Sequence, residues 1–366
     1  MSGSIYGTIF RISTWGESHG KGVGVVVDGC PAGLCLCEAD IQEYLDRRKP
    51  GQSRYTTPRK EEDAVEILSG VFEGRTTGAP ISMIVRNQTQ RSGDYSEIAS
   101  YYRPGHADYT FDEKYGFRDY RGGGRSSGRE TIARVAAGAI ACKLLLELGI
   151  DVTAYSRKIG GIGIADANFD KAEIRRNPFC MPDAQAAAQV GRLLDEKLTE
   201  QDSVGGVIEC RINGIPAGVG EPVFEKLSAN LGKAILSIGA VKGFEIGDGF
   251  AAADSFGSVN NDELYYDEAG VLRKHTNHGG GIYGGISDGS EIVFRAAVKP
   301  TPSIARLQKT VNQSGENIEI SIRGRHDPII VPRAVVVVEC MAAIALLDML
   351  FADMTSKLEN VIKIFS

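Results

Sequence analysis

Apolar residues recur at intervals of three and four along several stretches of the chain, which is the spacing of helices that pack against a core. The clearest stretch runs from Arg129 to Gly149, where Ser126 or Ser127 is a natural N-cap and the glycine is a natural end. Further helices are predicted over 38–48, which Pro50 and Gly51 terminate, over 183–198 and 222–236, and over 332–351, where Pro332 suits the first turn.

Other stretches alternate apolar and polar residues or form short apolar runs, a pattern that predicts β-strands. The first such stretch, 5–12, is followed by a break at Trp15-Gly16 and by a second stretch, 23–27. Strands are also predicted over 65–72, 80–85, 152–162, 205–212, 292–298 and 316–323. Because strands and helices are interleaved, without a linker or a repeat of fixed period, we expect one α+β domain over residues 1–366.

Residues 87–127 show little periodicity but contain many arginines, tyrosines and glycines. Aperiodic stretches of this length are uncommon within compact proteins and are usually functional. Glycine is abundant throughout, at 45 of 366 residues, which indicates many tight turns and close backbone approaches. We therefore expect part of the functional site in this stretch.

The charge of the chain argues against several classes of partner. The net charge is −6, so no overall field would draw the protein to nucleic acid or to an anionic membrane. The most apolar region, 329–351, is interrupted by Arg333, Glu339 and Asp348, which favours a core helix over a membrane span. With no visible signal peptide and no Cys-x-x-Cys pair among seven cysteines, we expect a cytoplasmic protein with reduced thiols and no metal site.

Arginine is concentrated in one part of the chain. Residues 40–134 contain 13 Arg and 3 Lys, whereas the rest contains 12 Arg and 13 Lys. A guanidinium group binds carboxylate or phosphate through two parallel hydrogen bonds, which an ammonium group cannot do. The bias indicates either a set of structural Arg–carboxylate pairs or a pocket for a small ligand with several negative charges.

Four of the five histidines lie beside glycine or proline in loop-like segments. They are His19, His106, His278 and His326. Loops at the ends of elements often hold catalytic groups, and histidine titrates near neutral pH. No two of these residues have the spacing of metal ligands with a cysteine or an acid, so we expect acid–base chemistry.

Two segments combine hydroxyl groups and a cation with the start of a predicted helix, as phosphate sites do. The first runs from Gly122 to Glu130, and the second is Lys299-Pro300-Thr301-Pro302-Ser303. Neither is a Walker loop or a dinucleotide fingerprint. Residues 121–125 also resemble an RNA-binding Arg-Gly-Gly segment, but a single copy beside a helix lacks the repetition of that class. By spacing alone, two such segments suggest two phosphorylated ligands, for example a mononucleotide cofactor and a phosphorylated substrate.

Several particular motifs follow one another along almost the whole chain. They are Gly16-Glu17-Ser18-His19-Gly20, Asp46-Arg47-Arg48, Pro50-Gly51-Gln52-Ser53-Arg54-Tyr55, Arg103-Pro104-Gly105-His106-Ala107-Asp108, Gly124-Arg125-Ser126-Ser127 and Arg325-His326-Asp327-Pro328. In identity and order these motifs resemble those of the chorismate synthase family.

The resemblance implies a carbon–oxygen lyase of the shikimate pathway, on the route to the aromatic amino acids. Such an enzyme converts 5-enolpyruvylshikimate 3-phosphate to chorismate by 1,4-anti-elimination of phosphate and a ring proton, and it requires reduced FMN although no net oxidation occurs. The resemblance also implies an α+β fold with helices between sheets in a layered β-α-β sandwich, a homotetramer, and NADPH as a candidate reductant. A substrate with one phosphate and two carboxylates suits the arginine-rich segment.

The same resemblance assigns roles to individual residues. The anionic substrate would be bound by Arg48 and Arg54, with Arg47, Arg129 and Arg134 as neighbours. Both phosphate-like segments would then belong to one flavin site, which replaces the two ligands suggested by spacing. The flavin residues would be Arg125, Ser126, Ser127, Gly239, Ala240, Gly284, Lys299, Pro300, Thr301, Pro302, Ser303 and Arg325.

For the chemistry, the resemblance implies that His19 protonates the departing phosphate and that His106 stabilises the reduced flavin. Asp327 would relay the ring proton by way of the flavin. A different interpretation pairs the Asp327 carboxylate with Arg325 or a neighbouring arginine. Two other functions also stay open, namely a flavin- or NADPH-dependent oxidoreductase acting on a small anionic substrate and a non-catalytic anion-binding protein.

Overall fold

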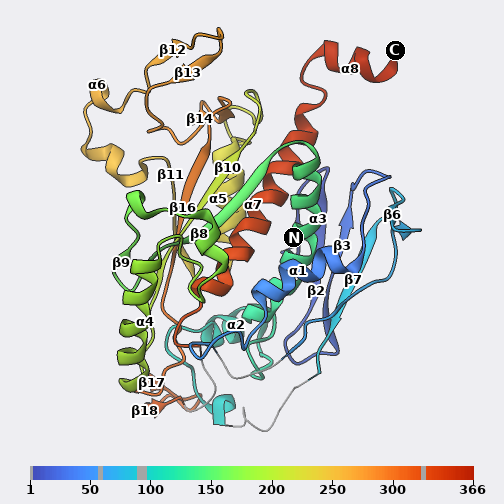
Figure 1. Ribbon diagram of the computed structural model, residues 1–366. Helices are drawn as coiled ribbons and strands as arrows, with labels where there is room; N and C mark the ends of the chain where they lie inside the picture. Colours follow the sequence, from blue (N-terminus) through green and yellow to red (C-terminus); the bar gives the residue numbers. More distant parts are fainter. Residues whose placement is uncertain (1–2, 57–60, 89–96, 323–326) are drawn as a thin grey trace.

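Two five-stranded antiparallel sheets enclose a layer of helices in the computed structural model, which describes residues 3–56, 61–88, 97–322 and 327–366 (Figure 1). The strand order is β1-β2-β3-β7-β4 in the first sheet and β11-β16-β10-β8-β9 in the second. The first sheet comprises β1 (Ile5–Tyr6), β2 (Arg11–Gly16), β3 (Gly22–Asp28), β7 (Ile81–Arg86) and β4 (Val65–Ile67). The second comprises β11 (Val241–Ile246), β16 (Ile292–Val298), β10 (Gly206–Asn213), β8 (Asp151–Ile159) and β9 (Ile162–Gly163). The predicted α+β class with helices between sheets is confirmed.

Two central helices connect the sheets through their packing. Helix α3 (Thr131–Glu147) packs on β3, α7 (Val331–Asp353) packs on β8, and the two helices pack against each other. Helix α1 (Glu38–Arg48) packs beside α3, and α5 (Leu227–Leu236) packs beside α7. Alternate residues of the strands face this layer, as the alternating sequence pattern requires.

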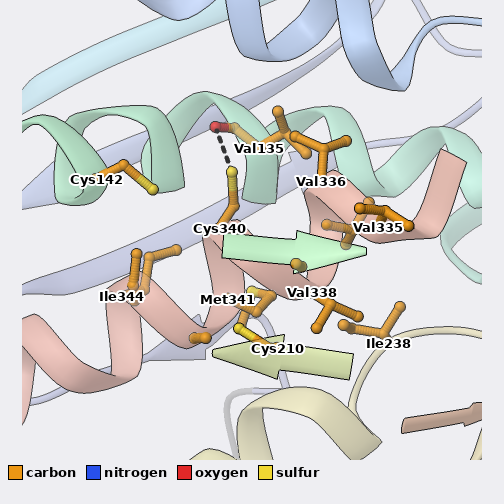
Figure 2. Packing of buried hydrophobic residues seen from close by; sticks show 14 of the residues in the cluster. Val135, Cys142, Cys210, Ile238, Val335, Val336, Val338, Cys340, Met341 and Ile344 are labelled. Atoms are coloured by element: carbon orange, nitrogen blue, oxygen red, sulfur yellow. Dashed lines mark hydrogen bonds between the residues drawn. The ribbon is translucent and has the colours of Figure 1, made fainter. Parts of the chain in front are cut away.

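The two central helices approach each other closely at Gly138. A Cβ atom at this position would lie 2.1 Å from the Cβ of Cys340 on α7, and the Cys340 thiol lies 3.7 Å from the carbonyl oxygen of Val135. Figure 2 shows how these side chains interdigitate between the helices and β10. Because a glycine lets the two backbones approach closely, its identity here is a packing requirement.

Helix α7 is long and apolar enough to cross a membrane, but 78% of its most apolar 18-residue window is buried inside the protein. Val338, Leu346 and Leu347 are fully buried, and Glu339 is 6% exposed. The interpretation of this stretch as a core helix is confirmed. All seven cysteines of the chain are free thiols.

The remaining elements lie around this body. They are the hairpins β5 (Val71–Phe72) with β6 (Arg75–Thr76), β12 (Leu264–Tyr266) with β13 (Leu272–Lys274), β14 (Ile282–Tyr283) with β15 (Ile286–Ser287), and β17 (Leu307–Val311) with β18 (Asn317–Ser321), and the helices α2 (Asp108–Tyr115), α4 (Ala184–Thr199), α6 (Gly257–Asn260) and α8 (Leu358–Phe365). The β12–β13 hairpin and α8 extend away from the sheets (Figure 1).

The sequence predictions hold for the longest elements and fail at glycines. The helix over 38–48 and the strand over 292–298 are confirmed to the residue. The strand predicted over 5–12 is interrupted: β1 and the start of β2 form its two ends, but Gly7 has φ +88° and the next three backbone N–H groups bind the Asp348 carboxylate instead of a neighbouring strand. The helix predicted over 222–236 begins only at Leu227. Helices α2 and α8 and strand β11 were not predicted.

Candidate active site

His19 lies in the turn between β2 and β3 and is 8% exposed. Its Nδ1 atom is 3.1 Å from Ser18 Oγ, and that hydroxyl donates to the carbonyl oxygen of Gly122 over 3.2 Å. Because a serine hydroxyl has only one proton, Ser18 then accepts from Nδ1–H of the imidazole. This tautomer makes Nε2 the ring nitrogen at which a proton is taken up and released.

The imidazole of His19 packs directly against the glycine-rich segment. Gly122 has φ +63°, and a Cβ atom there would lie only 2.3 Å from Cε1 of His19. A side chain at position 122 would therefore displace the histidine. The sequence predicted close backbone approaches in this segment, and the structure places one of them at a candidate catalytic group.

Arg48 is the last residue of α1, and only 3% of its side chain is exposed. It donates from Nη1 to Asp63 (2.8 Å), from Nε to Thr131 Oγ1 (3.1 Å) and from Nη2 to the Gly128 carbonyl (3.2 Å). Burial and the nearby Arg333 lower the pKa of Arg48 to about 10, while Asp63 opposes this effect. Arg48 thus ties the end of α1 to the start of α3.

Arg129 shares the Asp63 carboxylate with Arg48. Its Nη1 donates to Asp63 Oδ1 over 2.9 Å and is paired with Glu61, and its Nε donates to Asn87 Oδ1 over 2.5 Å. Within the part of the chain that the structure describes, no hydrogen bond is made by Nη2 of Arg129. That N–H group is available to an anionic ligand.

Asp327 joins the same network through Arg333, near the start of α7. Its carboxylate accepts from Nη1 of Arg333 over 2.5 Å, and Nε of Arg333 donates to the backbone carbonyl of Arg48 over 3.1 Å. The pairing of Asp327 with a neighbouring arginine is therefore present. The predicted flavin residue Arg325 and His326 lie outside the described residues.

His106 belongs to a second group, together with the segment 299–303. Its Nε2 lies 2.8 Å from Ser303 Oγ, and Lys299 Nζ donates to the Gly105 carbonyl over 2.6 Å. Gly105 has φ +70°, and a Cβ atom there would lie 3.0 Å from the Cβ of Pro302. The structure thus brings His106 to predicted flavin residues that are almost 200 positions away in the chain.

The segment 299–303 has the donors of an anion site. Thr301 Oγ1 is buried and has no hydrogen-bond partner among the described residues, which leaves a hydroxyl for a ligand. Burial and the charge of Lys242 lower the pKa of Lys299. The backbone N–H of Lys299 also donates to the Ala240 carbonyl over 2.9 Å, which brings the predicted pair Gly239-Ala240 to this segment.

The glycine-rich segment forms two short 3₁₀ turns, Gly124–Ser126 and Gly128–Glu130, before α3 begins. Ser127 accepts from the backbone N–H of Arg129 and caps the second turn, whereas Ser126 donates to a carbonyl within the first. Arg125 donates to the Gly16 carbonyl (3.2 Å) and to Thr14 Oγ1 (2.7 Å). Its guanidinium group therefore holds the end of β2, next to the turn with His19.

Three predicted substrate arginines are engaged elsewhere. Arg47 forms a bidentate pair with the buried Glu339 of α7 (2.5 and 2.9 Å). Arg54 is paired with Asp195 at the surface, and its side chain is 68% exposed. Arg134 binds Glu130 one turn earlier in the chain and also Ser237. Gly284, a predicted flavin residue, has φ +61° and lies between β14 and β15. It is distant in sequence from the three arginines.

Three residues of the network were not predicted. Asp63 and Asn87 contact the candidate arginines but belong to no motif that was singled out, and Arg333 was interpreted only as an interruption of a core helix. A signal was available for two of them: Asn87 directly follows a predicted strand, at the start of the aperiodic stretch, and Arg333 is a charge within an apolar helix.

The chain is similar to known proteins over almost its whole length. A family model described as chorismate synthase matches residues 10–351. The chorismate synthase of Lachnospira eligens is 69% identical over 361 residues, covering 99% of this chain and 98% of that protein. The chorismate synthase of Lachnoclostridium phytofermentans is 66% identical over 365 residues and the whole length of both chains. A crystal structure of chorismate synthase superposes with a TM-score of 0.77 at 33% identity, covering 98% of this chain and 97% of that one.

Proposed function

The chain belongs to the chorismate synthase family, and we propose that its reaction takes place between the His19–Arg129–Asp327 network and the His106 group. Membership makes the protein a lyase of the shikimate pathway that eliminates phosphate from 5-enolpyruvylshikimate 3-phosphate to give chorismate. The oxidoreductase and anion-binding alternatives are not favoured by these relatives.

We infer that reduced FMN is the cofactor and that its phosphate binds at the segment 299–303. The fit of this segment rests on the buried hydroxyl of Thr301, which has no hydrogen-bond partner among the described residues, and on the cation Lys299, whose pKa is lowered by burial and by the charge of Lys242. Ser303 and His106 would lie at the edge of the same site. When bound, reduced FMN supplies electron density to the substrate as phosphate leaves and recovers it afterwards, so no net oxidation results.

The residues of the chain supply binding and proton transfer. Nη2 of Arg129 would receive an anionic group of the substrate, while Nη1 of the same guanidinium group is bound by Asp63, whose other carboxylate oxygen binds Arg48. His19, protonated on both nitrogens, donates to Ser18 from Nδ1 and gives its other proton from Nε2 to the departing phosphate. The carboxylate of Asp327 accepts the ring proton, and the ion pair with Arg333 orients it.

A single observation carries this proposal. The turn that carries the candidate acid His19 and the candidate base Asp327, which are far apart in the chain, belong to one continuous set of contacts through Asn87, Arg129 and Asp63 and then through Arg48 and Arg333. An elimination needs an acid and a base at fixed positions about one substrate, and this set of contacts supports such an arrangement.

An anaerobic assay with chemically reduced FMN tests the function, because it needs no reductase. We expect one phosphate released for each chorismate formed, with no consumption of NADPH during turnover. NADPH oxidised in proportion to product would indicate an oxidoreductase. Substrate bound without release of phosphate would indicate a non-catalytic binding protein. Repeating the assay with oxidised FMN and NADPH shows whether the chain reduces its own flavin.

We also infer that the chain works as a single cytoplasmic domain and assembles as a homotetramer. Self-association is supported by large apolar side chains that are exposed on β12, on α8 and in the segment before α6. Phe250 is 84% exposed, Phe256 79%, Tyr266 73% and Phe365 86%. Surfaces of this kind usually mark protein contacts. Light scattering during size-exclusion chromatography gives the mass of the assembly, and a monomeric mass would refute this inference.

A further inference from the structure

Asn87, directly after β7, uses its whole side chain in hydrogen bonds to two parts of the proposed site. Nδ2 donates to the backbone carbonyls of Glu17 (3.0 Å) and Gly20 (2.9 Å), which flank His19 in its turn. Oδ1 accepts from Nε of Arg129 over 2.5 Å. The backbone N–H of Asn87 donates to the carbonyl of Lys21 over 3.1 Å, which adds a third contact with the same turn.

We propose that Asn87 is a positioning residue that holds the candidate acid His19 and the candidate substrate ligand Arg129 at a fixed separation. This inference rests on the functions proposed above for those two residues. The acid and the cation must act on one bound substrate, so their relative position matters as much as their presence. Asn87 is the residue through which the turn and the guanidinium group are joined.

The chemistry of the position specifies an amide. A carboxylate of the same shape would accept from Arg129 but would present oxygen to the carbonyls of Glu17 and Gly20, with no proton to donate. A hydroxyl group has only one proton for the two carbonyls. The amide of asparagine has two donors and one acceptor, which matches the three partners.

The location of Asn87 makes it a firm support. It follows the last residue of β7, and Arg86 of that strand pairs with Gly22, the first residue of β3 after the His19 turn. On its other side, the turn is bound to the glycine-rich segment by the hydrogen bond from Ser18 to the carbonyl of Gly122. Loss of the Asn87 amide removes two hydrogen bonds from the carbonyls that flank His19, so the turn would be held less firmly at the end of β7.

The test compares Asn87→Ala, Asn87→Asp and a matched control, with kcat and KM measured in the anaerobic assay with reduced FMN. Asn177 is the control, because its amide donates to the carbonyls of Glu173 and Met181 and accepts from the Phe179 N–H in another loop. We expect kcat to fall by about 10- to 100-fold in both Asn87 variants, the range for a displacement near 1 Å, while Asn177→Ala changes melting temperature but not kcat.

Asn87→Ala and Asn87→Asp distinguish the contact of Asn87 with Arg129 from its contacts with the His19 turn. Calorimetry of 5-enolpyruvylshikimate 3-phosphate with FMN-free protein should show several-fold weaker binding for Asn87→Ala, because Arg129 loses an acceptor. Asn87→Asp keeps an acceptor for Arg129 but cannot support the turn, so it should lose kcat all the same. Normal kcat in Asn87→Asp would overturn the proposed support of His19.

A double-mutant cycle with His19→Ala distinguishes this inference from the function on which it rests. If Asn87 acts through His19, adding Asn87→Ala to His19→Ala lowers kcat by less than about twofold further. A further loss as large as that in the wild-type background would refute the positioning role. If His19→Ala itself retains full kcat, it is the proposed function of His19 that fails, whatever the Asn87 variants do.

Discussion

Substituting Gly122 by alanine tests whether His19 must remain where the structure places it. The added Cβ would lie 2.3 Å from Cε1 and 2.5 Å from Nδ1 of His19, and 2.9 Å from Ser18 Oγ. Carbon atoms in contact prefer about 3.5 Å, so the ring must move by roughly 1 Å. A displacement of that size can lower turnover by about 100-fold. Alanine at φ +63° also costs about 1–2 kcal/mol of folding free energy.

Gly124→Ala separates these two effects. Gly124 has φ +53°, so its backbone penalty is similar, but a Cβ there meets no described atom within 4 Å. We expect both variants to lose about the same free energy of unfolding in urea, whereas only Gly122→Ala loses kcat in the anaerobic assay. KM for the substrate should change little, because Arg129 is not displaced. Equal kcat values in the two variants would refute the catalytic placement of His19 against Gly122.

Four further changes test other parts of the structure. Arg48→Lys keeps the charge but loses the contacts of the guanidinium fork, so calorimetry should show substrate binding weakened by roughly 1–3 kcal/mol, and unchanged affinity would contradict a role in the site. Asp327→Asn should lower turnover by about 100-fold or more at unchanged FMN affinity and should lower the melting temperature, because Arg333 loses its carboxylate partner; near-normal turnover would exclude it as the base. Burial and Lys242 lower the pKa of Lys299, so Lys299 should lose its charge, and the protein its affinity for FMN, at a lower pH than an ordinary lysine would. In a fluorescence titration of FMN binding, Lys242→Gln should move this loss of affinity to higher pH. An unchanged titration would show that Lys242 does not affect the charge of Lys299. Gly138→Ala drives a methyl group between α3 and α7, so it should lower the free energy of unfolding by about 1–3 kcal/mol, which urea denaturation measures.

Elements with a strong local pattern could be predicted from the sequence, and those that depend on distant partners could not. The helix over 38–48 has an acidic first turn, a basic last turn and a terminating proline, and it forms as predicted. By contrast, the conformation near the start of the chain depends on backbone hydrogen bonds to the carboxylate of Asp348, which lies toward the far end of α7. No pattern within residues 5–12 contains that information.

The same distinction applies to the candidate site. His19, His106 and Asp327 were predicted because their motifs are particular, but motifs do not say which arginines are occupied in the folded chain. Arg47 and Arg48 are adjacent and chemically identical. The helix turns them to different sides, so one faces Glu339 in the core and the other faces Asp63 beside Arg129. Both residues thus form Arg–carboxylate pairs, and the pair of Arg48 also contains the candidate substrate ligand Arg129.

The unpredicted residues show what a network requires beyond its motifs. A buried guanidinium group costs free energy unless its donors are satisfied, so each candidate arginine needs carboxylates and amides that never touch a substrate. Asp63 serves two arginines at once and adopts φ +48°, a conformation uncommon outside glycine. These residues are required by the contacts of the folded chain and not by the reaction itself. A search for chemical motifs therefore does not identify them. A reliable signal for them is polar residues at the ends of buried elements: Asn87 after β7 and Arg333 at the start of α7 both occupy such places.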